Sequence, residues 1–517
     1  MAPSADCRNP SGEDRQKHHV VMFPFMAQGH IIPFIQLSNL LAARTGFTIT
    51  IVSTPLNVQA LTPTIQSAHQ NDSALDIRLA ELPFSSADHG LPPHTENTDS
   101  LPYSQVLTLM EAAEYLQPHF ENLIRRICSE DGRTPLCIIS DMFLGWTQDV
   151  ADLFGIPRIF FLTCGVYGTL LYYSMWNHLP HTKTDSEEFI LPDLPHISLH
   201  RSQLPTNIKM ATGTDPWSLF QARHISPNMR SWGFICNSFE QIEHRYLEHL
   251  RKSTGRPVWA VGPLLPPEFI SSTQSHAVRD QLLQGKEANG ASDAISCLRW
   301  LDSQIVSSVL YVSFGSQNTI SASNMKELAL GMESSGQPFI WVVRPPIGVP
   351  STKEFSSEFL PDGFEERMKV KNQGLVIKKW APQREILSHP STGGFLSHCG
   401  WNSTLESLSQ GVPMIGWPIA AEQYFNSKLL EEEVGVCVEI CRGSEGELTK
   451  EKVERTVKML MWEEKGGGMR ERAAAMRDAA RKAVMDNGEG AEKGSSVCYV
   501  DDMIQNILTT SCLSRSL

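Results

Sequence analysis

Residues 380–423 read WAPQREILSHPSTGGFLSHCGWNSTLESLSQGVPMIGWPIAAEQ. In the middle of this segment an apolar strand end runs into small and polar residues and then into an amphipathic helix. We expect Asn402 or Ser403 to cap this helix, and Gly411 with Pro413 to end it. The start of such a helix offers free backbone N–H groups and the positive end of the helix dipole. The segment therefore predicts a site for a phosphate or pyrophosphate.

Other side chains of the segment suit the remaining parts of a sugar nucleotide. Trp380 follows an apolar run and therefore lies at a strand end, where α/β sheets bind ligands. Its indole is a flat partner for a flat base such as uracil. Gln383 and Glu406 can hydrogen-bond ribose hydroxyls, and Glu422 and Gln423 open a further helical run from which they can reach a sugar. A purely structural βαβ unit would explain any one of these residues, but not the whole set.

Segment 380–423 closely resembles the signature box of the plant family 1 UDP-dependent glycosyltransferases, which modify small molecules. The resemblance extends from about residue 19 to about residue 508. It implies the GT-B fold, in which two Rossmann-like domains face each other across a cleft. The donor contacts that it implies are, from base to sugar, with uracil (Trp380), ribose (Gln383, Glu406), diphosphate (His398, Asn402, Ser403) and sugar (Trp401, Glu422, Gln423), with Ala381 and Gly400 in the same site.

The last two positions of the box bear on the identity of the sugar. Glu422 stands where Asp is more usual in the family, so the carboxylate is kept and its reach is longer. In the family, Gln at the position of Gln423 goes with glucose and His with galactose, although the correlation is imperfect. We therefore expect UDP-glucose as co-substrate, with UDP-galactose and UDP-xylose as alternatives.

Length, charge and cysteine content exclude several classes of protein. A chain of 517 residues is too long for one core, so at least two domains are expected. Lys and Arg number 44 against 57 Asp and Glu, a net charge of −13 that argues against a nucleic-acid partner. The eleven cysteines are scattered and include no CxxC pair, so we expect no zinc site and a reducing, cytoplasmic environment. We also expect a monomer.

The chain shows no targeting or membrane segment. Residues 1–18 form a polar tail, and the apolar run 20–27 that follows is too short for a signal peptide. Segment 154–176 is the most apolar long stretch, but Pro157, Arg158 and several glycines interrupt it. We therefore expect no membrane span.

Short apolar runs alternate with longer amphipathic ones, which predicts parallel α/β sheets. We expect, among others, strands over 20–25, 47–53, 136–140, 158–162, 308–313, 339–343, 375–377, 394–397 and 413–416, and helices over 32–43, 147–154, 293–301, 325–332 and 496–508. Segment 177–227 is rich in Pro, His and Thr and predicts an irregular excursion that can cover a pocket. The domain boundaries that follow are 19–254 for an acceptor-binding domain, 255–291 for a linker, 292–490 for a UDP-sugar-binding domain and 491–517 for a C-terminal helix and tail.

A histidine and an aspartate follow two of the predicted strands. His30 lies in the loop after the first strand, where it can act as a general base near neutral pH or merely cap the next helix. Asp141 follows the strand 136–140, and an Asp against a His fixes its tautomer. Sequence alone does not bring the two together. The resemblance supplies that link, because both match the family's catalytic pair.

The reaction that follows is an inverting displacement in which His30 takes a proton from an acceptor hydroxyl. Ser316 ends another predicted strand and can hydrogen-bond the phosphate. The chain has no Asp-x-Asp pair, the commonest metal anchor for a diphosphate, so we expect no metal. We expect the acceptor to be a small apolar molecule with a hydroxyl, a phenolic such as a flavonoid, or a terpenoid, with phenols favoured over alcohols.

Two other functions compete with this interpretation. A nicotinamide oxidoreductase needs G-x-G-x-x-G after its first strand, and here that loop has only Gly29. A non-catalytic binder of UDP-sugar or phenolics would not need the pair of His30 and Asp141. His178, His181, His196 and His200 are expected in solvent or loops, whereas Met142, Phe143, Trp146, Tyr167 and Trp176 suit either the core or the acceptor pocket.

Overall fold

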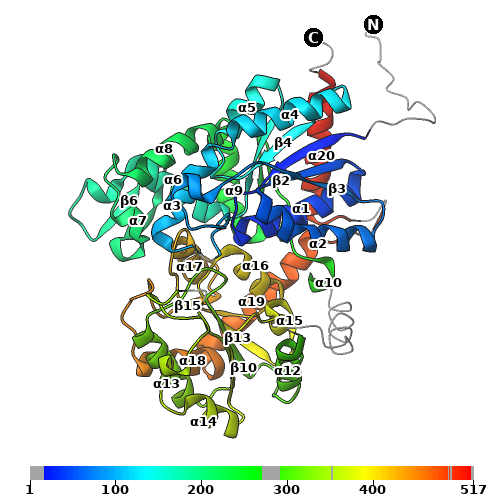
Figure 1. The fold of residues 1–517 in the computed structure, drawn as a ribbon. Helices are drawn as coiled ribbons and strands as arrows, with labels where there is room; N and C mark the ends of the chain where they lie inside the picture. Colours follow the sequence, from blue (N-terminus) through cyan, green and yellow to red (C-terminus); the bar gives the residue numbers. More distant parts are fainter. Residues whose placement is uncertain are drawn as a thin grey trace.

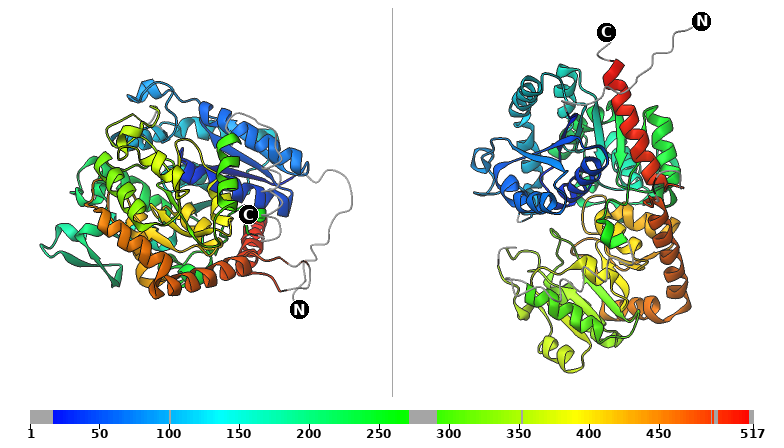
Figure 2. Two further views of the ribbon diagram at one scale, coloured as in Figure 1. Left: turned by 90° about the horizontal axis from the view of Figure 1, so that it is seen from below. Right: turned by 90° about the vertical axis from the view of Figure 1, so that its right-hand side faces the viewer.

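Two lobes, each built on a parallel β-sheet, make up the protein (Figures 1 and 2). The computed structural model describes residues 17–99, 101–270, 291–350, 353–486, 488 and 492–513. Most of the predicted tail 1–18, and residues 271–290 of the predicted linker, lie outside the described residues. No described helix is long and apolar enough to cross a membrane.

The first lobe contains a seven-stranded sheet whose neighbouring strands are all parallel. Its order is β3 (Asp76–Glu81), β2 (Thr48–Ser53), β1 (His19–Phe23), β4 (Cys137–Ser140), β5 (Arg158–Leu162), β8 (Gly233–Cys236) and β9 (Val258–Ala260). Its helices are α1 (Gln28–Thr45), α2 (Pro55–Asn71), α3 (Val106–Glu114), α4 (Gln117–Asp131), α5 (Thr147–Phe154), α6 (Val166–His178), α7 (Thr206–Lys209), α8 (Pro216–Met229), α9 (Glu240–Thr254) and α10 (Pro267–Ile270).

The second lobe repeats this plan with six parallel strands. Their order is β12 (Gly374–Ile377), β11 (Phe339–Val342), β10 (Val309–Ser313), β13 (Thr392–Ser397), β14 (Met414–Gly416) and β15 (Cys437–Glu439). The helices are α12 (Ala291–Asp302), α13 (Ala322–Ser335), α14 (Phe364–Val370), α15 (Gln383–Ser388), α16 (Trp401–Ser409), α17 (Gln423–Lys428), α18 (Lys450–Trp462) and α19 (Glu464–Ala483).

The predicted strands and helices are confirmed, with ends that shift by a few residues. The central strands are buried on both faces, which is why each reads as a short apolar run. The exception is segment 177–227, where the prediction of an irregular excursion is wrong in part. A hairpin of β6 (Glu188–Leu191) and β7 (Leu194–His200) lies there, and so does the 14-residue helix α8, whose start is fixed by Asp215 as cap and Pro216 at the first position.

Two elements belong to the first lobe although the predicted domain boundaries place them outside it. Strand β9 lies inside the predicted linker 255–291, yet it pairs with β8 as the edge of the first sheet. Helix α20 (Ser495–Leu513) follows the second lobe in sequence but lies along the first lobe, as Figures 1 and 2 show. There Asp502 accepts a hydrogen bond from the Trp259 indole (2.8 Å), and Asp501 pairs with Arg44 (2.5 Å).

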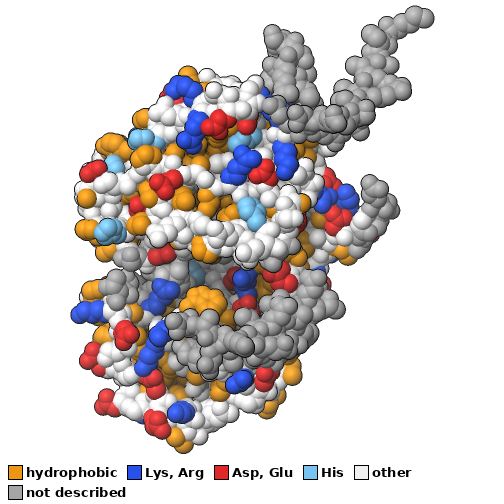
Figure 3. Space-filling view, turned by 45° about the vertical axis from the view of Figure 1, so that its right-hand side comes forward, with side chains coloured by type: hydrophobic (Ala, Val, Ile, Leu, Met, Phe, Trp, Pro, Cys, Tyr) orange, Lys and Arg blue, Asp and Glu red, His pale blue; other side chains and the backbone are white. Residues whose placement is uncertain are grey.

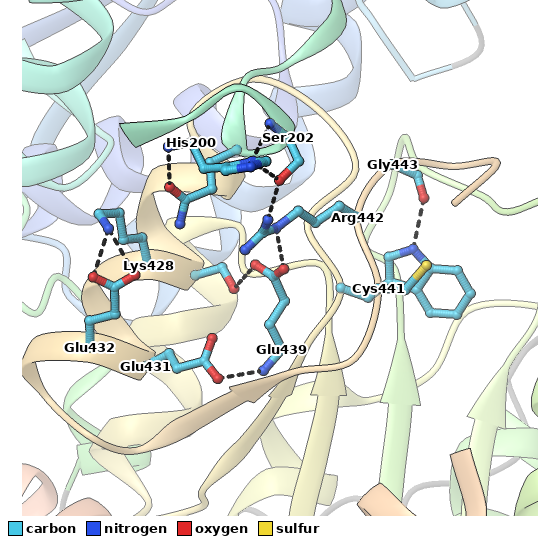
Figure 4. Close-up of polar contacts among 12 residues, drawn as sticks. His200, Ser202, Lys428, Glu431, Glu432, Glu439, Cys441, Arg442 and Gly443 are labelled. Atoms are coloured by element: carbon cyan, nitrogen blue, oxygen red, sulfur yellow. Dashed lines mark hydrogen bonds and ion pairs between the residues drawn. The ribbon is translucent and has the colours of Figure 1, made fainter. Parts of the chain in front are cut away.

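A polar contact also joins the β6–β7 extension to the second lobe (Figure 4). Arg442 donates to the Ser202 hydroxyl at 2.5 Å and forms an ion pair with Glu439. Ser202 in turn lies 2.8 Å from the imidazole of His200. The two lobes therefore touch here as well as where α6 packs against α17 and α9 against α19.

Candidate active site

A cavity of about 570 Å³ lies between the two lobes, and Figure 3 shows the molecule hollowed there. The carboxyl ends of strands from both sheets face it, as expected for ligand sites in α/β proteins. The predicted site residues that line it are His30, Ser316, Trp380, Ala381, Gln383, His398, Gly400, Trp401, Asn402, Ser403, Glu406, Glu422 and Gln423. Asp141 lies directly behind His30.

The sheet topology brings His30 and Asp141 together. Strands β1 and β4 are neighbours, with Phe23 opposite Ser140, so the residues that follow them share one sheet edge. His30 Nδ1 lies 2.7 Å from Asp141 Oδ2, and Asp141 is fully buried. His30 belongs to the first turn of α1 and makes no capping bond. Because Nδ1 faces the carboxylate, Nε2 is left to accept a proton.

Electrostatics favour the protonated form of this imidazole. Burial lowers the pKa of His30, but the charge and hydrogen bond of Asp141, together with the charge of Glu422, outweigh burial and raise the pKa above its ordinary value. The Glu422 side chain comes from the second lobe, so groups from both lobes set the proton affinity of His30. A histidine held in this way can accept a proton and stay charged beside its partner.

The start of α16 is open to the cavity. Gly400 is the capping residue and offers no side-chain bond, so the prediction that Asn402 or Ser403 caps the helix is wrong. The amide of Asn402 instead donates to the Gly29 carbonyl of the other lobe (3.0 Å), and the Ser403 hydroxyl accepts from Gln383 (3.0 Å). The backbone N–H groups of the first turn thus remain for an anion.

Two glycines hold the imidazole of His398 between them. A Cβ on Gly315 would lie 2.8 Å from the ring, and one on Gly400 would lie 2.4 Å from its Nε2. Burial, and then the charge of Arg344, lowers the pKa of His398 to about 4. The ring is therefore neutral at pH 7 and can donate one N–H.

The residues predicted to hold the base and the ribose also lie on the cavity wall. The Trp380 side chain is 73% exposed on the cavity wall, which suits a stacking surface. Gln383 donates to Glu406 (2.7 Å), and the Tyr311 hydroxyl donates to Gln383 (3.2 Å). Burial outweighs the hydrogen bond from Gln383 and raises the pKa of Glu406 above its ordinary value.

The residues predicted near the sugar differ in what their side chains contact. Gln423 uses its carbonyl oxygen to accept the N–H groups of Ile419 (3.1 Å) and Ala420 (2.9 Å), so its amide nitrogen is left for a ligand. Trp401 is buried, and its indole donates to the Asn237 carbonyl across the lobes at 2.7 Å. The Trp401 ring therefore joins the lobes as well as lining the cavity.

Several cavity residues escaped the sequence analysis. Arg344 and Lys379 place two cations on the cavity wall. Arg344 comes two residues after β11, so its position at a strand end was a signal in the sequence. Of the predicted pocket residues, Met142 and Phe143 line the cavity, whereas Trp146, Tyr167 and Trp176 belong to the core. His181, expected in solvent or a loop, is buried. Within the described ranges, no three His, Cys, Asp or Glu side chains are grouped to hold a metal.

Comparison with known proteins identifies the family. The family model described as "UDP-glucoronosyl and UDP-glucosyl transferase" matches residues 289–471, and "Glycosyltransferase, N-terminal domain" matches residues 16–266. UDP-glycosyltransferase 92A1 of Arabidopsis thaliana is 41% identical over 498 residues, which cover 95% of this chain and 97% of the relative. Crocetin glucosyltransferase 3 of Crocus sativus is 43% identical over 87% of this chain and 92% of its own length.

Solved structures show the same fold. UGT73P12 of Glycyrrhiza uralensis, complexed with glycyrrhetinic acid 3-O-monoglucuronide, matches with a TM-score of 0.79 and 29% identity over 97% of each chain. UGT71G1 of Medicago truncatula, complexed with UDP-glucose, matches with a TM-score of 0.75 and 25% identity over 95% of this chain and 98% of its own. The two Rossmann-like lobes form the GT-B fold, and the chain belongs to the plant UDP-glycosyltransferases, enzymes that transfer a glycosyl group.

Proposed function

We propose that this enzyme transfers glucose, with inversion, from UDP-glucose to a hydroxyl of a small, largely apolar acceptor, a plant phenolic such as a flavonoid or a terpenoid. One observation carries the proposal. The His30–Asp141 pair of the first lobe and the open start of α16 in the second lobe line the same cavity, so a base and a diphosphate site face each other.

In the proposed reaction, Nε2 of His30 takes the proton of the acceptor hydroxyl. The acceptor oxygen forms a bond to the anomeric carbon as the bond from that carbon to UDP breaks on the opposite face. Asp141 stabilises the imidazolium that results. The α16 N–H groups, the Ser316 hydroxyl and the neutral His398 ring then bind the UDP anion.

The same residues support a reaction without a metal cofactor. The cavity wall carries the cations Arg344 and Lys379, whose charge can take the place of a metal ion beside a diphosphate. The sequence has no Asp-x-Asp pair to bind a metal ion, which agrees with charge neutralisation by these side chains. We assign uracil to Trp380 and the ribose to Gln383 and Glu406.

For the donor sugar, we favour glucose because Gln423 ends the signature box with its amide nitrogen free to donate. UDP-galactose and UDP-xylose are the alternatives. Two relatives support glucose as the donor sugar: scopoletin glucosyltransferase of Nicotiana tabacum and UDP-glucose flavonoid 3-O-glucosyltransferase 7 of Fragaria ananassa. These relatives are 39% and 37% identical to the chain.

The lining of the acceptor end favours a neutral, apolar acceptor. The described first-lobe residues on the cavity wall include no Lys, Arg, Asp or Glu. A carboxylate acceptor would therefore find no lysine or arginine in that lobe, and His30 is the group on this wall that could pair with it. The large apolar and aromatic side chains there are Phe25, Ile32, Leu101, Tyr103, Val106, Met110, Met142, Phe143, Tyr172 and Trp217. We favour phenols, because a hydroxyl of lower pKa gives up its proton to one imidazole more readily.

The decisive experiment combines an acceptor screen with a histidine variant. Phenols, terpenoid alcohols and carboxylic acids are incubated with UDP-glucose, and products are read by mass spectrometry. His30→Ala should lower turnover roughly 10²- to 10⁴-fold while UDP affinity stays unchanged. His178→Ala is the matched control, because His178 pairs with Asp193 (2.8 Å) outside the cavity. Wild-type turnover in His30→Ala, or UDP binding without any UDP release, would refute the proposal.

We further propose that the enzyme acts as a monomer in the cytosol. The described cysteines at positions 128, 137, 164, 236, 297, 399, 437, 441 and 498 are all free thiols, which fits a reducing compartment. Light scattering coupled to gel filtration would test the first statement, and the location of a fluorescent fusion the second.

A further inference from the structure

Arg158 is a fully buried cation beneath the proposed catalytic pair. It is the first residue of β5, next to β4, the strand that Asp141 follows, and none of its side chain is exposed. Within the described part of the chain, no carboxylate oxygen forms an ion pair with its guanidinium. Burying an arginine without an acidic partner is costly, so the position calls for a reason.

The guanidinium is satisfied by neutral groups gathered around the end of β4. Nη2 donates to the Asp141 carbonyl oxygen at 3.3 Å. The remaining bonds are from Nε to the hydroxyls of Ser140 (2.7 Å) and Thr147 (2.9 Å), from Nη1 to the Ser231 hydroxyl (2.8 Å) and from Nη2 to the Asn228 amide oxygen (2.8 Å).

These bonds hold three consecutive residues. Ser140 is held through its side chain and Asp141 through its backbone carbonyl. Met142 is held through Asn228, whose amide nitrogen donates to the Met142 carbonyl at 2.6 Å. Met142 lines the cavity, so the same network supports the wall of the acceptor end.

We propose that Arg158 is a positioning residue for glycosyl transfer, which fixes residues 140–142 so that the Asp141 carboxylate meets His30 at hydrogen-bond distance. The inference rests on the proposed function, in which His30 is the base. This role explains why Arg158 is buried without an ion-pair partner, because its N–H donors hold residues 140–142, which orient His30. A planar fork with five N–H donors can make all these bonds at once, whereas a lysine cannot.

The charges around the network agree with this role. Burial lowers the pKa of Arg158 to about 10; the charges of Tyr173, Asp141 and Asp149 raise it, and Arg230 lowers it further. Arg158 is therefore still a cation at neutral pH, and its charge attracts the carboxylate that faces His30. The charged groups that face His30 are Asp141 and Glu422.

Removing Arg158 should act on the base in a measurable direction. If residues 140–142 shift, the bond from Asp141 to His30 lengthens. That bond and charge raise the pKa of His30, so their weakening lowers it. The base must be unprotonated to act, so the acidic limb of the pH profile of kcat/KM should move to lower pH while kcat falls.

The test compares Arg158→Met and Arg158→Lys with wild type in UDP release from UDP-glucose and the best acceptor of the screen. Misplacement of the base should lower kcat roughly 10- to 100-fold in both variants. The acidic limb should move to lower pH, while UDP affinity stays unchanged. Arg251→Met is the matched control, because Arg251 of the same lobe pairs with Glu240 (2.9 Å) and Glu248 (2.8 Å) away from the cavity.

Asn228→Ala keeps the inference testable if the Arg158 variants do not fold. It removes the bonds of Asn228 to Arg158, Met142 and Tyr173 and leaves the other bonds of Arg158 in place, so kcat and the acidic limb should move in the same directions by less. Folded Arg158 variants with a wild-type pH profile would overturn the inference, and so would a wild-type Asn228→Ala when the Arg158 variants fail to fold. An active His30→Ala would instead overturn the proposed function.

Discussion

Replacing Asp141 by Asn tests the proposed base most directly, because both oxygens of the carboxylate are already in use. Oδ2 lies 2.7 Å from His30 Nδ1, and Oδ1 accepts the Phe143 backbone N–H at 3.1 Å. An amide has one acceptor oxygen. Either the Phe143 N–H loses its partner, or the amide nitrogen faces His30 and forces the proton onto Nε2, which can then no longer act as a base.

The size of the effect follows from the bond that is lost. A hydrogen bond to a charged group contributes roughly 1.5–3 kcal/mol. Since about 1.4 kcal/mol equals one pKa unit or a tenfold change in rate, the His30 pKa should fall by roughly one to two units and kcat by roughly 10- to 150-fold. If the amide turns its nitrogen to His30, the loss in kcat grows toward roughly 10⁴-fold.

The assay is UDP release across pH 5 to 9, with saturating UDP-glucose and a fixed acceptor. The pKa of His30 is raised in the enzyme, so the wild-type acidic limb should lie above the ordinary pKa of imidazole, and Asp141→Asn should move it to lower pH. Asp193→Asn, which alters the surface pair with His178, is the control. A full kcat and an unmoved limb in Asp141→Asn would refute the reasoning.

Three further results are expected. Trp380→Ala should weaken UDP binding by roughly 1–3 kcal/mol in calorimetric titration, the contribution of stacking on a base, with little change in Tm because the side chain is 73% exposed; an unchanged Kd would remove Trp380 from the uracil site. Gly400→Ala should lower UDP affinity more than tenfold, because the new Cβ would lie 2.4 Å from the His398 ring, whereas Gly467→Ala, with its nearest atom at 3.9 Å, should bind UDP normally; equal affinities would contradict this account. Activity should persist in EDTA with kcat/KM higher for UDP-glucose than for UDP-galactose, and an EDTA loss that manganese restores would argue for a metal.

Ligand sites in α/β proteins lie at the carboxyl ends of the strands, which explains why much of the candidate site was predictable. Each buried strand leaves a short apolar run, and the residues after it mark one sheet edge, which is how His30, Asp141 and Ser316 were found. Their mutual placement could not be predicted from the sequence, since β1 pairs with β4 although 111 positions separate His30 from Asp141. The resemblance, rather than any local pattern, supplied that contact.

Local propensity failed where tertiary contacts compete with it. Asn is a common N-cap residue, yet the side-chain amide of Asn402 donates a hydrogen bond to the Gly29 carbonyl of the other lobe. The indole N–H of Trp401 likewise donates to the backbone carbonyl of Asn237 in the other lobe. Segment 177–227 was expected to be irregular because of its composition, but cap chemistry at Asp215 and Pro216 begins a regular helix within it. Interlobe contacts leave no signal in one sequence, so such residues are the hardest to predict.

The return of α20 to the first lobe has a consequence for how the protein is made. The indole of Trp259 on β9 donates its hydrogen bond to Asp502, 243 positions later on the chain. As the ribosome releases the chain from its N-terminus, the first lobe must therefore wait for the whole second lobe to be synthesised before its last helix arrives. A premature stop ahead of Ser495 would thus damage the half of the enzyme that is farthest from it in sequence, and a tag fused after Leu513 would lie beside the first lobe.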